Sequence, residues 1–417
     1  MTPSPALGRR LGTSDAVFLG LGSMIGAGVF VAFAPAAEAA GSWLLVGLVL
    51  AAAVAYANAT SSAQLAAQYP TSGGTYVYGR ERLGPWWGFV AGWGFVVGKT
   101  ASCAAMALTF AAYAVPEPWQ RPAAVAAVVA LAAVNYRGVT RTARLTRLIV
   151  VVVLLALAVG VAASLLGGDP DGSGVALNPA DLDVHGVLQS AGLLFFAFAG
   201  YARVATMAEE VRDPRRTIPR AITIALLLTV AVYAVVGAAV LAALGPSGVA
   251  STTAPLADAV TAGSWSWASP VVRVGAAAAS LGALLALVAG VSRTALAMGR
   301  AGDLPSWLAA VHPRFHVPHR AEVALAGAVC ALVLTVDLRG AIGFSAFGVL
   351  LYYLVANVAA YTQTGSHRRF PRALQVAGAA GCAVLGLSLP LASVLTGAGV
   401  LVVGVVYRAA RAPRRTT

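Results

Sequence analysis

Long apolar runs separated by short polar stretches make up most of the chain. A helix that crosses the hydrocarbon of a membrane needs about 20 mostly apolar residues. By this criterion the sequence predicts twelve membrane-spanning helices, of which the fourth and the last two are short. They begin near Asp15, Ser42, Trp86, Pro122, Leu145, Val187, Ile218, Val271, Ala321, Ile342, Ala373 and Leu391. The connections between them are too short for a soluble domain.

The composition supports a membrane protein. Charged residues make up 10% of the 417 residues and hydrophobic ones 59%, whereas soluble domains carry about 25% charged residues. The net charge is +13, but the basic residues lie in short clusters between apolar runs, so we expect no nucleic acid partner. No catalytic triad or metal-ligand spacing is present. We therefore expect no cofactor, no metal and no enzymatic activity.

The positions of the arginines predict how the chain is oriented. Twelve spans place both termini on one side, and most arginines fall on that side. Arg121, Arg273 and Arg339 are the arginines predicted on the opposite side. Because loops rich in arginine and lysine stay in the cytoplasm, we expect both termini to be cytoplasmic and the protein to lie in the cytoplasmic (inner) membrane.

Two spans carry residues that weaken a helix in mid-membrane. The first contains four glycines within nine residues, over 20–28, and the sixth contains the run 195–201 with Gly200. These spans occupy matching positions if spans one to five and six to ten are two repeats, which is typical of a transporter binding site. The N–H groups that an unwound stretch exposes attract a carboxylate, and its free carbonyls attract an ammonium. The alternative is that the small residues only let helices pack closely.

Four motifs resemble those of the amino acid–polyamine–organocation (APC) superfamily. Residues 22–30, GSMIGAGVF, resemble its G-S-x-I-G-x-G-V/I-F signature, and 70–78, PTSGGTYVY, its P-x-S-G-G-x-Y motif. Residues 208–219, AEEVRDPRRTIP, are similar to its E-E-x-x-N/D-P-x-R-x-I/M-P motif, and 292–305 resemble the loop after its eighth span. The motifs occur in the family's order over almost the whole chain.

The resemblance implies an all-α integral membrane fold with an inverted five-helix repeat, similar to the leucine transporter fold, in which helices 1 and 6 are broken. The first repeat would span 14–168, the second 186–363, and a C-terminal helix pair 372–409. The carboxylate-binding backbone of the family would fall on Ser23, Met24, Ile25, Gly26, Ala27 and Gly28. Its ammonium- and side-chain-binding stretch would fall on Phe196, Ala197, Phe198, Ala199 and Gly200.

The chain departs from the family at positions linked to ion coupling. Many members carry an acid two residues after the sixth-span glycine, where this chain has Ala202, and some carry a lysine in the fifth span, where Val153 stands. Lys99, the only lysine, lies inside the third span instead. It could carry a coupled proton, act as a fixed positive charge in place of sodium, bind a substrate carboxylate, or be structural.

Arg203, Glu209 and Glu210 fall on the inner half of the sixth span. They could form an inner gate with Arg144 or Arg147, or be interface charges beside a basic loop. A site wall with Phe196 and Phe198, and no acid for a cationic side chain, favours a neutral or hydrophobic amino acid. The resemblance to the APC superfamily implies a secondary active amino acid permease that works by alternating access, and we expect a symporter for uptake with a proton as the coupling ion. An exporter or exchanger of the same fold is the alternative, and a sensor or channel fits less well.

Overall fold

The computed structural model describes residues 12–69, 73–138, 143–168, 173–201 and 211–411, and these residues form helices and loops without β-strands. The first half contains α1 (Thr13–Met24), α2 (Gly28–Val31), α3 (Phe33–Ala40), α4 (Leu44–Gln68), α5 (Thr75–Leu83), α6 (Pro85–Ala114), α7 (Gln120–Tyr136) and α8 (Ala143–Leu166). The second half contains α9 (Val184–Phe198), α11 (Pro214–Ser251), α12 (Pro255–Thr261), α13 (Ser269–Arg300), α14 (His319–Thr335), α15 (Leu338–Tyr361), α16 (Arg372–Leu387) and α17 (Leu391–Arg411).

Every predicted span start lies within a few residues of the start of a helix. Over the described residues, eight segments are long and apolar enough to cross a membrane by length and composition. Four shorter helices, α7, α9, α14 and α16, occupy the other predicted spans. A helix satisfies its backbone hydrogen bonds internally, which is what a chain in hydrocarbon requires.

Proline and glycine mark several of the helix boundaries. Gly84 has a φ of +103°, a conformation that residues with a Cβ rarely adopt, and it turns the chain from α5 into α6. Pro85 is the first residue of α6, where the missing N–H has no partner to lose. Gly245, with a φ of 66°, kinks α11 directly before Pro246.

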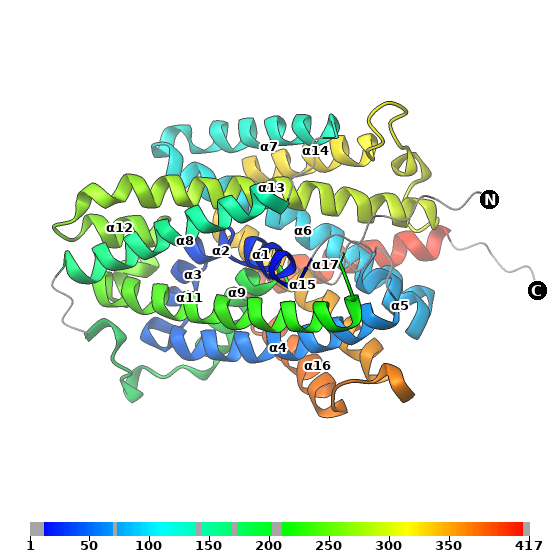
Figure 1. Ribbon diagram of the computed structural model, residues 1–417, viewed down its shortest axis with the longest axis horizontal. Helices are drawn as coiled ribbons and strands as arrows, with labels where there is room; N and C mark the ends of the chain where they lie inside the picture. Colours follow the sequence, from blue (N-terminus) through cyan, green and yellow to red (C-terminus); the bar gives the residue numbers. More distant parts are fainter. Residues whose placement is uncertain (1–11, 70–72, 139–142, 169–172, 202–210, 412–417) are drawn as a thin grey trace, which may run out of the picture.

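The first two helices lie near the middle of the bundle, where α1 is seen almost end-on (Figure 1). α1 packs against α8, α11 and α13, while α9 packs against α3 and α4. α6 contacts both α13 and α15. The interruptions that follow α1 and α9 are therefore surrounded by longer helices that hold them in the interior.

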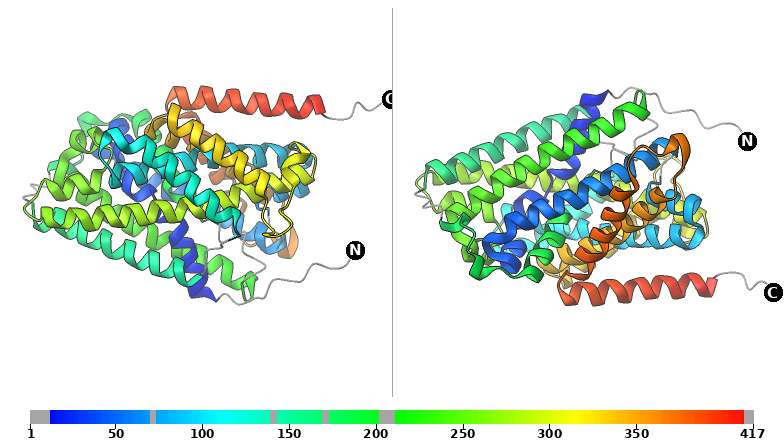
Figure 2. Two further views of the ribbon diagram at one scale, coloured as in Figure 1. Left: turned by 90° about the horizontal axis from the view of Figure 1, so that it is seen from above. Right: turned by 90° about the horizontal axis from the view of Figure 1, so that it is seen from below.

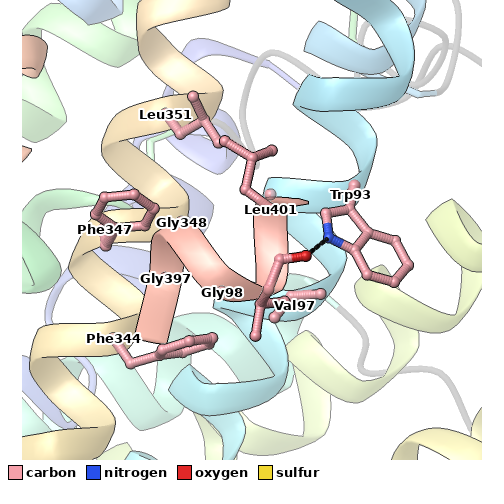
Figure 3. Close-up of a pocket in the computed structure, with 11 residues that line it drawn as sticks. Trp93, Val97, Gly98, Phe344, Phe347, Gly348, Leu351, Gly397 and Leu401 are labelled. Atoms are coloured by element: carbon pink, nitrogen blue, oxygen red, sulfur yellow. Dashed lines mark hydrogen bonds between the residues drawn. The ribbon is translucent and has the colours of Figure 1, made fainter. Parts of the chain in front are cut away.

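α17 lies along the outer edge of the bundle (Figure 2) and packs on α6 and α15. The contact is close because Gly397 and Gly404 leave no Cβ between the helices, and Trp93 Nε1 donates to the carbonyl of Val400 at 2.9 Å (Figure 3). The cavity between these helices has a volume of about 20 Å³. It is large enough for one water molecule and too small for an amino acid.

A buried carboxylate ties α17 to the rest of the molecule. Asp303, 6% exposed, follows α13 and accepts hydrogen bonds from Tyr76 Oη at 2.8 Å and Arg80 Nη1 at 3.3 Å. Arg408 of α17 forms an ion pair with the other carboxylate oxygen and stacks over the rings of Trp86 and Phe89. Burial, together with the hydrogen bond to Asp303 and its charge, raises the pKa of Tyr76 to about 12. We call Asp303, Tyr76, Arg80 and Arg408 the Asp303 cluster.

Candidate substrate site

The first helix break lies between α1 and α2. α1 ends at Met24, and Ile25 takes a non-helical ψ of 61° before the chain re-enters a helix at Gly28. The N–H of Ile25 bonds to Leu21 and that of Gly26 to the carbonyl of Met24. The first N–H groups of α2 therefore have no carbonyl one helical turn earlier to which they could donate.

The second break follows α9, which ends at Phe198 with Ala199 as its C-cap. The last carbonyls of a helix have no partner within it, so the end of α9 presents oxygens with partial negative charge. The two breaks touch. A Cβ added to Gly200 would lie 2.1 Å from the carbonyl oxygen of Ser23, and one added to Gly28 would lie 2.6 Å from the Cβ of Ala197.

Tyr233 of α11 lies next to both breaks. Its hydroxyl lies 2.6 Å from the carbonyl oxygen of Met24 and 3.1 Å from that of Ala197. With one proton the hydroxyl donates to one oxygen at a time, and the shorter bond goes to the end of α1. The side chain is 1% exposed, and its ring packs on Phe198 at 5.1 Å. Tyr233 therefore fixes the relative position of the two helix ends.

We predict that Tyr233→Phe weakens substrate binding about tenfold, because it removes the hydroxyl that lies between the Met24 and Ala197 carbonyls and so loosens both helix ends. The measurement is the Kd of the purified protein for an amino acid, the ligand that the sequence predicts for this site. Tyr361→Phe, on an exposed ring stacked with Arg372, is the matched control and should leave the Kd unchanged. Equal Kd values for Tyr233→Phe and wild type would show that Tyr233 does not position the site.

A cavity of about 720 Å³ opens between the breaks and α13. This volume lies within the range of sites that hold small molecules. Its deep part is bounded by both breaks and by α6, and it continues along α13 to Arg300 and to His316 in the following loop. That loop lies on the side for which the sequence predicts a cytoplasmic location.

The cavity brings together most of the residues that the sequence singled out. Those that line it are Ser23, Met24, Gly26, Ala27, Gly28, Lys99, Phe196, Ala197, Ala199 and Gly200. Ile25 and Phe198 are buried and do not line it; Phe198, 0% exposed, packs on Tyr233 instead. The predicted gating residues Arg203, Glu209 and Glu210 lie outside the described residues.

Arg147, a predicted partner of that gate, is engaged elsewhere. It forms an ion pair with Asp15 of α1 at 2.7 Å and stacks over the ring of Phe18 at 5.1 Å. The side chain of Arg144 lies outside the described residues. Arg147 thus ties the beginning of α8 to the beginning of α1.

Several wall residues carry no signal that the sequence analysis could use. Phe95, Ser102, Met106, Leu287 and Tyr352 line the cavity, but apolar and small residues are common throughout membrane helices. Tyr233 and Tyr352 are polar-tipped side chains within apolar spans, and this is the feature that could have marked them. Tyr233 bonds at the breaks and Tyr352 accepts from the N–H of Thr75 at 3.0 Å, and these partners depend on how the helices pack.

Lys99 reaches the end of α9 from α6. Its side chain is 7% exposed, and Nζ lies 3.5 Å from the carbonyl oxygen of Ala199. Tyr353 Oη donates to the same oxygen at 3.3 Å. Within the described part of the chain Lys99 forms no ion pair. A lysine ammonium therefore lies at the carbonyl end of the second break.

The charged groups along the cavity are of one sign. Lys99, Arg293 and Arg300 line it, together with His316, and no Asp or Glu among the described residues does so. A cavity of this kind concentrates anions and repels cations.

Comparison with known proteins identifies the family. The Amino acid permease family matches residues 15–406. The chain is 60% identical over 399 residues to an uncharacterised transporter of Mycobacterium tuberculosis, covering 96% of this chain and 90% of that protein. It is 25% identical to a branched-chain amino acid permease of Bacillus subtilis over 396 residues, covering 89% and 84% of the two chains. It is 28% identical to human cationic amino acid transporter 4 over 378 residues, covering 84% of this chain and 59% of the human one.

The match spans nearly the whole chain, as do the apolar helices that could cross a membrane. The protein is therefore a multi-pass membrane transporter. It belongs to the amino acid permease family of the APC superfamily.

Proposed function

We propose that this protein is a secondary active amino acid transporter that works by alternating access, and that the cavity at the two helix breaks is its substrate site. The observation that carries the proposal is the contact between the two breaks, with residues of both breaks lining one cavity. Twelve spans are proposed, with the inverted repeats at 14–168 and 186–363 and a helix pair at 372–409.

The zwitterion of an amino acid suits this arrangement. Backbone N–H groups over 23–28 would bind the α-carboxylate, because helix N-termini favour negative charge. Carbonyls over 196–200 would bind the ammonium, because helix C-termini favour positive charge. These contacts bind the α-carboxylate and α-ammonium that all amino acids share. Selectivity for one side chain must therefore come from the other residues that line the cavity.

The proposed direction is uptake across the cytoplasmic membrane, with both termini in the cytoplasm and a proton as the coupling ion. Arg203, Glu209 and Glu210 are proposed to gate the inner side. The sequence favoured a neutral or hydrophobic substrate. The described cavity wall, which has no carboxylate, supports the exclusion of a cationic side chain. One relative is named as a branched-chain amino acid permease and another as a cationic amino acid transporter. Membership of the family therefore does not determine which substrate side chain is bound.

Uptake of radiolabelled amino acids into proteoliposomes tests this proposal, with and without an inward proton gradient. Accumulation of an amino acid that depends on the gradient supports proton-coupled uptake. Counterflow without accumulation indicates an exchanger. Failure to transport or exchange any amino acid would contradict the proposed function.

A further inference from the structure

Lys99 lies where the substrate ammonium is proposed to bind, and this inference rests on that proposed function. Its Nζ contacts the Ala199 carbonyl, which belongs to the stretch 196–200 whose carbonyls are proposed to bind the substrate ammonium. The Ala199 oxygen accepts from both Lys99 and Tyr353, so the substrate ammonium would bind a neighbouring carbonyl of the same helix end. A protonated Lys99 and a bound substrate ammonium would therefore be two close positive charges in a largely buried site.

Among the residues that the structure describes, no neighbouring side chain neutralises Lys99. About one turn further along α6 lie Ser102 and Cys103, which carry no carboxylate. The hydroxyl of Ser102 is hydrogen-bonded to that of Ser345, with 2.5 Å between the two oxygens. α15 contributes the hydroxyl of Tyr353 to the same carbonyl. None of the described cavity-lining residues is an acid, while Arg293 and Arg300 add further positive charge along the path to the site.

A substrate with a negative side chain would supply the missing charge. Its side-chain carboxylate would lie between the Lys99 ammonium and the substrate ammonium and would accept a hydrogen bond from Lys99. The carboxylate would then attract both cations and offset the repulsion between them. A neutral side chain would leave the repulsion in place. From this geometry we propose that Lys99 is a specificity-determining residue that binds the side-chain carboxylate of a short acidic amino acid.

The short distance sets the length of that side chain. Because Lys99 and the substrate ammonium would lie at the same helix end, a second carboxylate one or two carbon atoms from the α-carbon would lie near both. Aspartate meets this condition, and glutamate does so less directly. The sequence favoured a neutral or hydrophobic amino acid instead, from Phe196 and Phe198 and from the absence of an acid for a cationic side chain, and the binding test below decides between the two substrates. The proposal also assigns Lys99 to substrate binding rather than to proton transfer.

The test compares aspartate with asparagine, which has nearly the same shape and no side-chain charge. Binding of each to the purified full chain is measured by isothermal titration, with glutamate, alanine and leucine as further ligands. Wild type is compared with Lys99→Met, which keeps the length of the side chain, and with Lys99→Arg, which keeps its charge. Arg121→Met, on an exposed arginine away from the cavity, controls for loss of one positive charge.

We expect wild type to bind aspartate about 10- to 100-fold more tightly than asparagine, the range for a charge-assisted hydrogen bond. Lys99→Met should lose that preference, whereas Lys99→Arg and Arg121→Met should keep it. Asparagine or leucine binding as well as aspartate to wild type would overturn the inference and leave the proposed function standing. A preference for aspartate that persists in Lys99→Met would also overturn it. If no amino acid binds wild type, the proposed function fails as well. Should Lys99→Met not fold, the wild-type comparison still decides.

Discussion

Gly200→Ala is expected to lower the affinity for substrate by about 100-fold and to abolish measurable uptake. The added Cβ would lie 2.1 Å from the carbonyl oxygen of Ser23 and 2.3 Å from its carbon, and these backbone atoms cannot turn aside as a side chain can. The two helix ends must therefore separate, and a displacement of about 1 Å in a binding site can cost two orders of magnitude. Substrate Kd and uptake into proteoliposomes measure the effect.

Gly327→Ala is the matched control for this prediction. Gly327 lies within α14, and a Cβ there would meet nothing within 4 Å. This variant should bind and transport as wild type does, and it should be slightly more stable because alanine favours a helix over glycine. Normal uptake by Gly200→Ala, in protein that elutes as a single species, would show that the contact between the breaks is not required.

Asp303→Ala is expected to cause the largest loss of stability, about 3–5 kcal/mol in the free energy of unfolding. The carboxylate is 6% exposed and bonds to Tyr76, Arg80 and Arg408. Its removal leaves Arg408, whose side chain is 15% exposed, without a counter-charge. The midpoint of thermal or denaturant unfolding in detergent measures the loss.

Glu38→Ala provides the comparison for a surface pair. Glu38 pairs with Arg339, but its side chain is 59% exposed, and exposed pairs contribute about 0–1 kcal/mol. We expect its unfolding midpoint to lie close to that of wild type. Equal effects of the two variants would mean that the Asp303 cluster does not hold α17 to the molecule.

The pH dependence of the Asp303 cluster follows from the raised pKa of Tyr76. Its phenol keeps its proton in the folded protein up to a pKa of about 12, whereas in the unfolded chain it ionises around 10. The unfolded state therefore loses its proton first as the pH rises. The stability that Tyr76 contributes is complete below pH 10 and is lost as the pH rises toward 12.

Much of the helical arrangement could be predicted from the sequence because hydrocarbon imposes a simple rule. Apolar runs that cross a membrane form helices, so the approximate helix starts follow from where these runs begin. The boundary between α5 and α6 coincides with Gly84 and Pro85. The helix break at 25–27 follows from the glycines around it, since a clustered loss of helix propensity is a local property.

The side-chain geometry of the site could be predicted only in part. Lys99 stands out in the sequence because a lone charge within an apolar span is costly. Phe196 and Phe198 look equivalent there, yet one lines the cavity and the other packs on Tyr233. Which of them faces the cavity depends on how α9 is rotated against α11. The same holds for Asp303, whose partners come from segments more than 100 residues away.

Backbone groups at the two breaks are proposed to bind both the carboxylate and the ammonium of an amino acid. The most direct test measures the Kd of wild type for its tightest-binding amino acid and for two analogues, the amine without the α-carboxylate and the acid without the amino group. We expect each analogue to bind at least about 100-fold more weakly, because each leaves one helix end without its partner. An analogue that binds as tightly as the amino acid would contradict it.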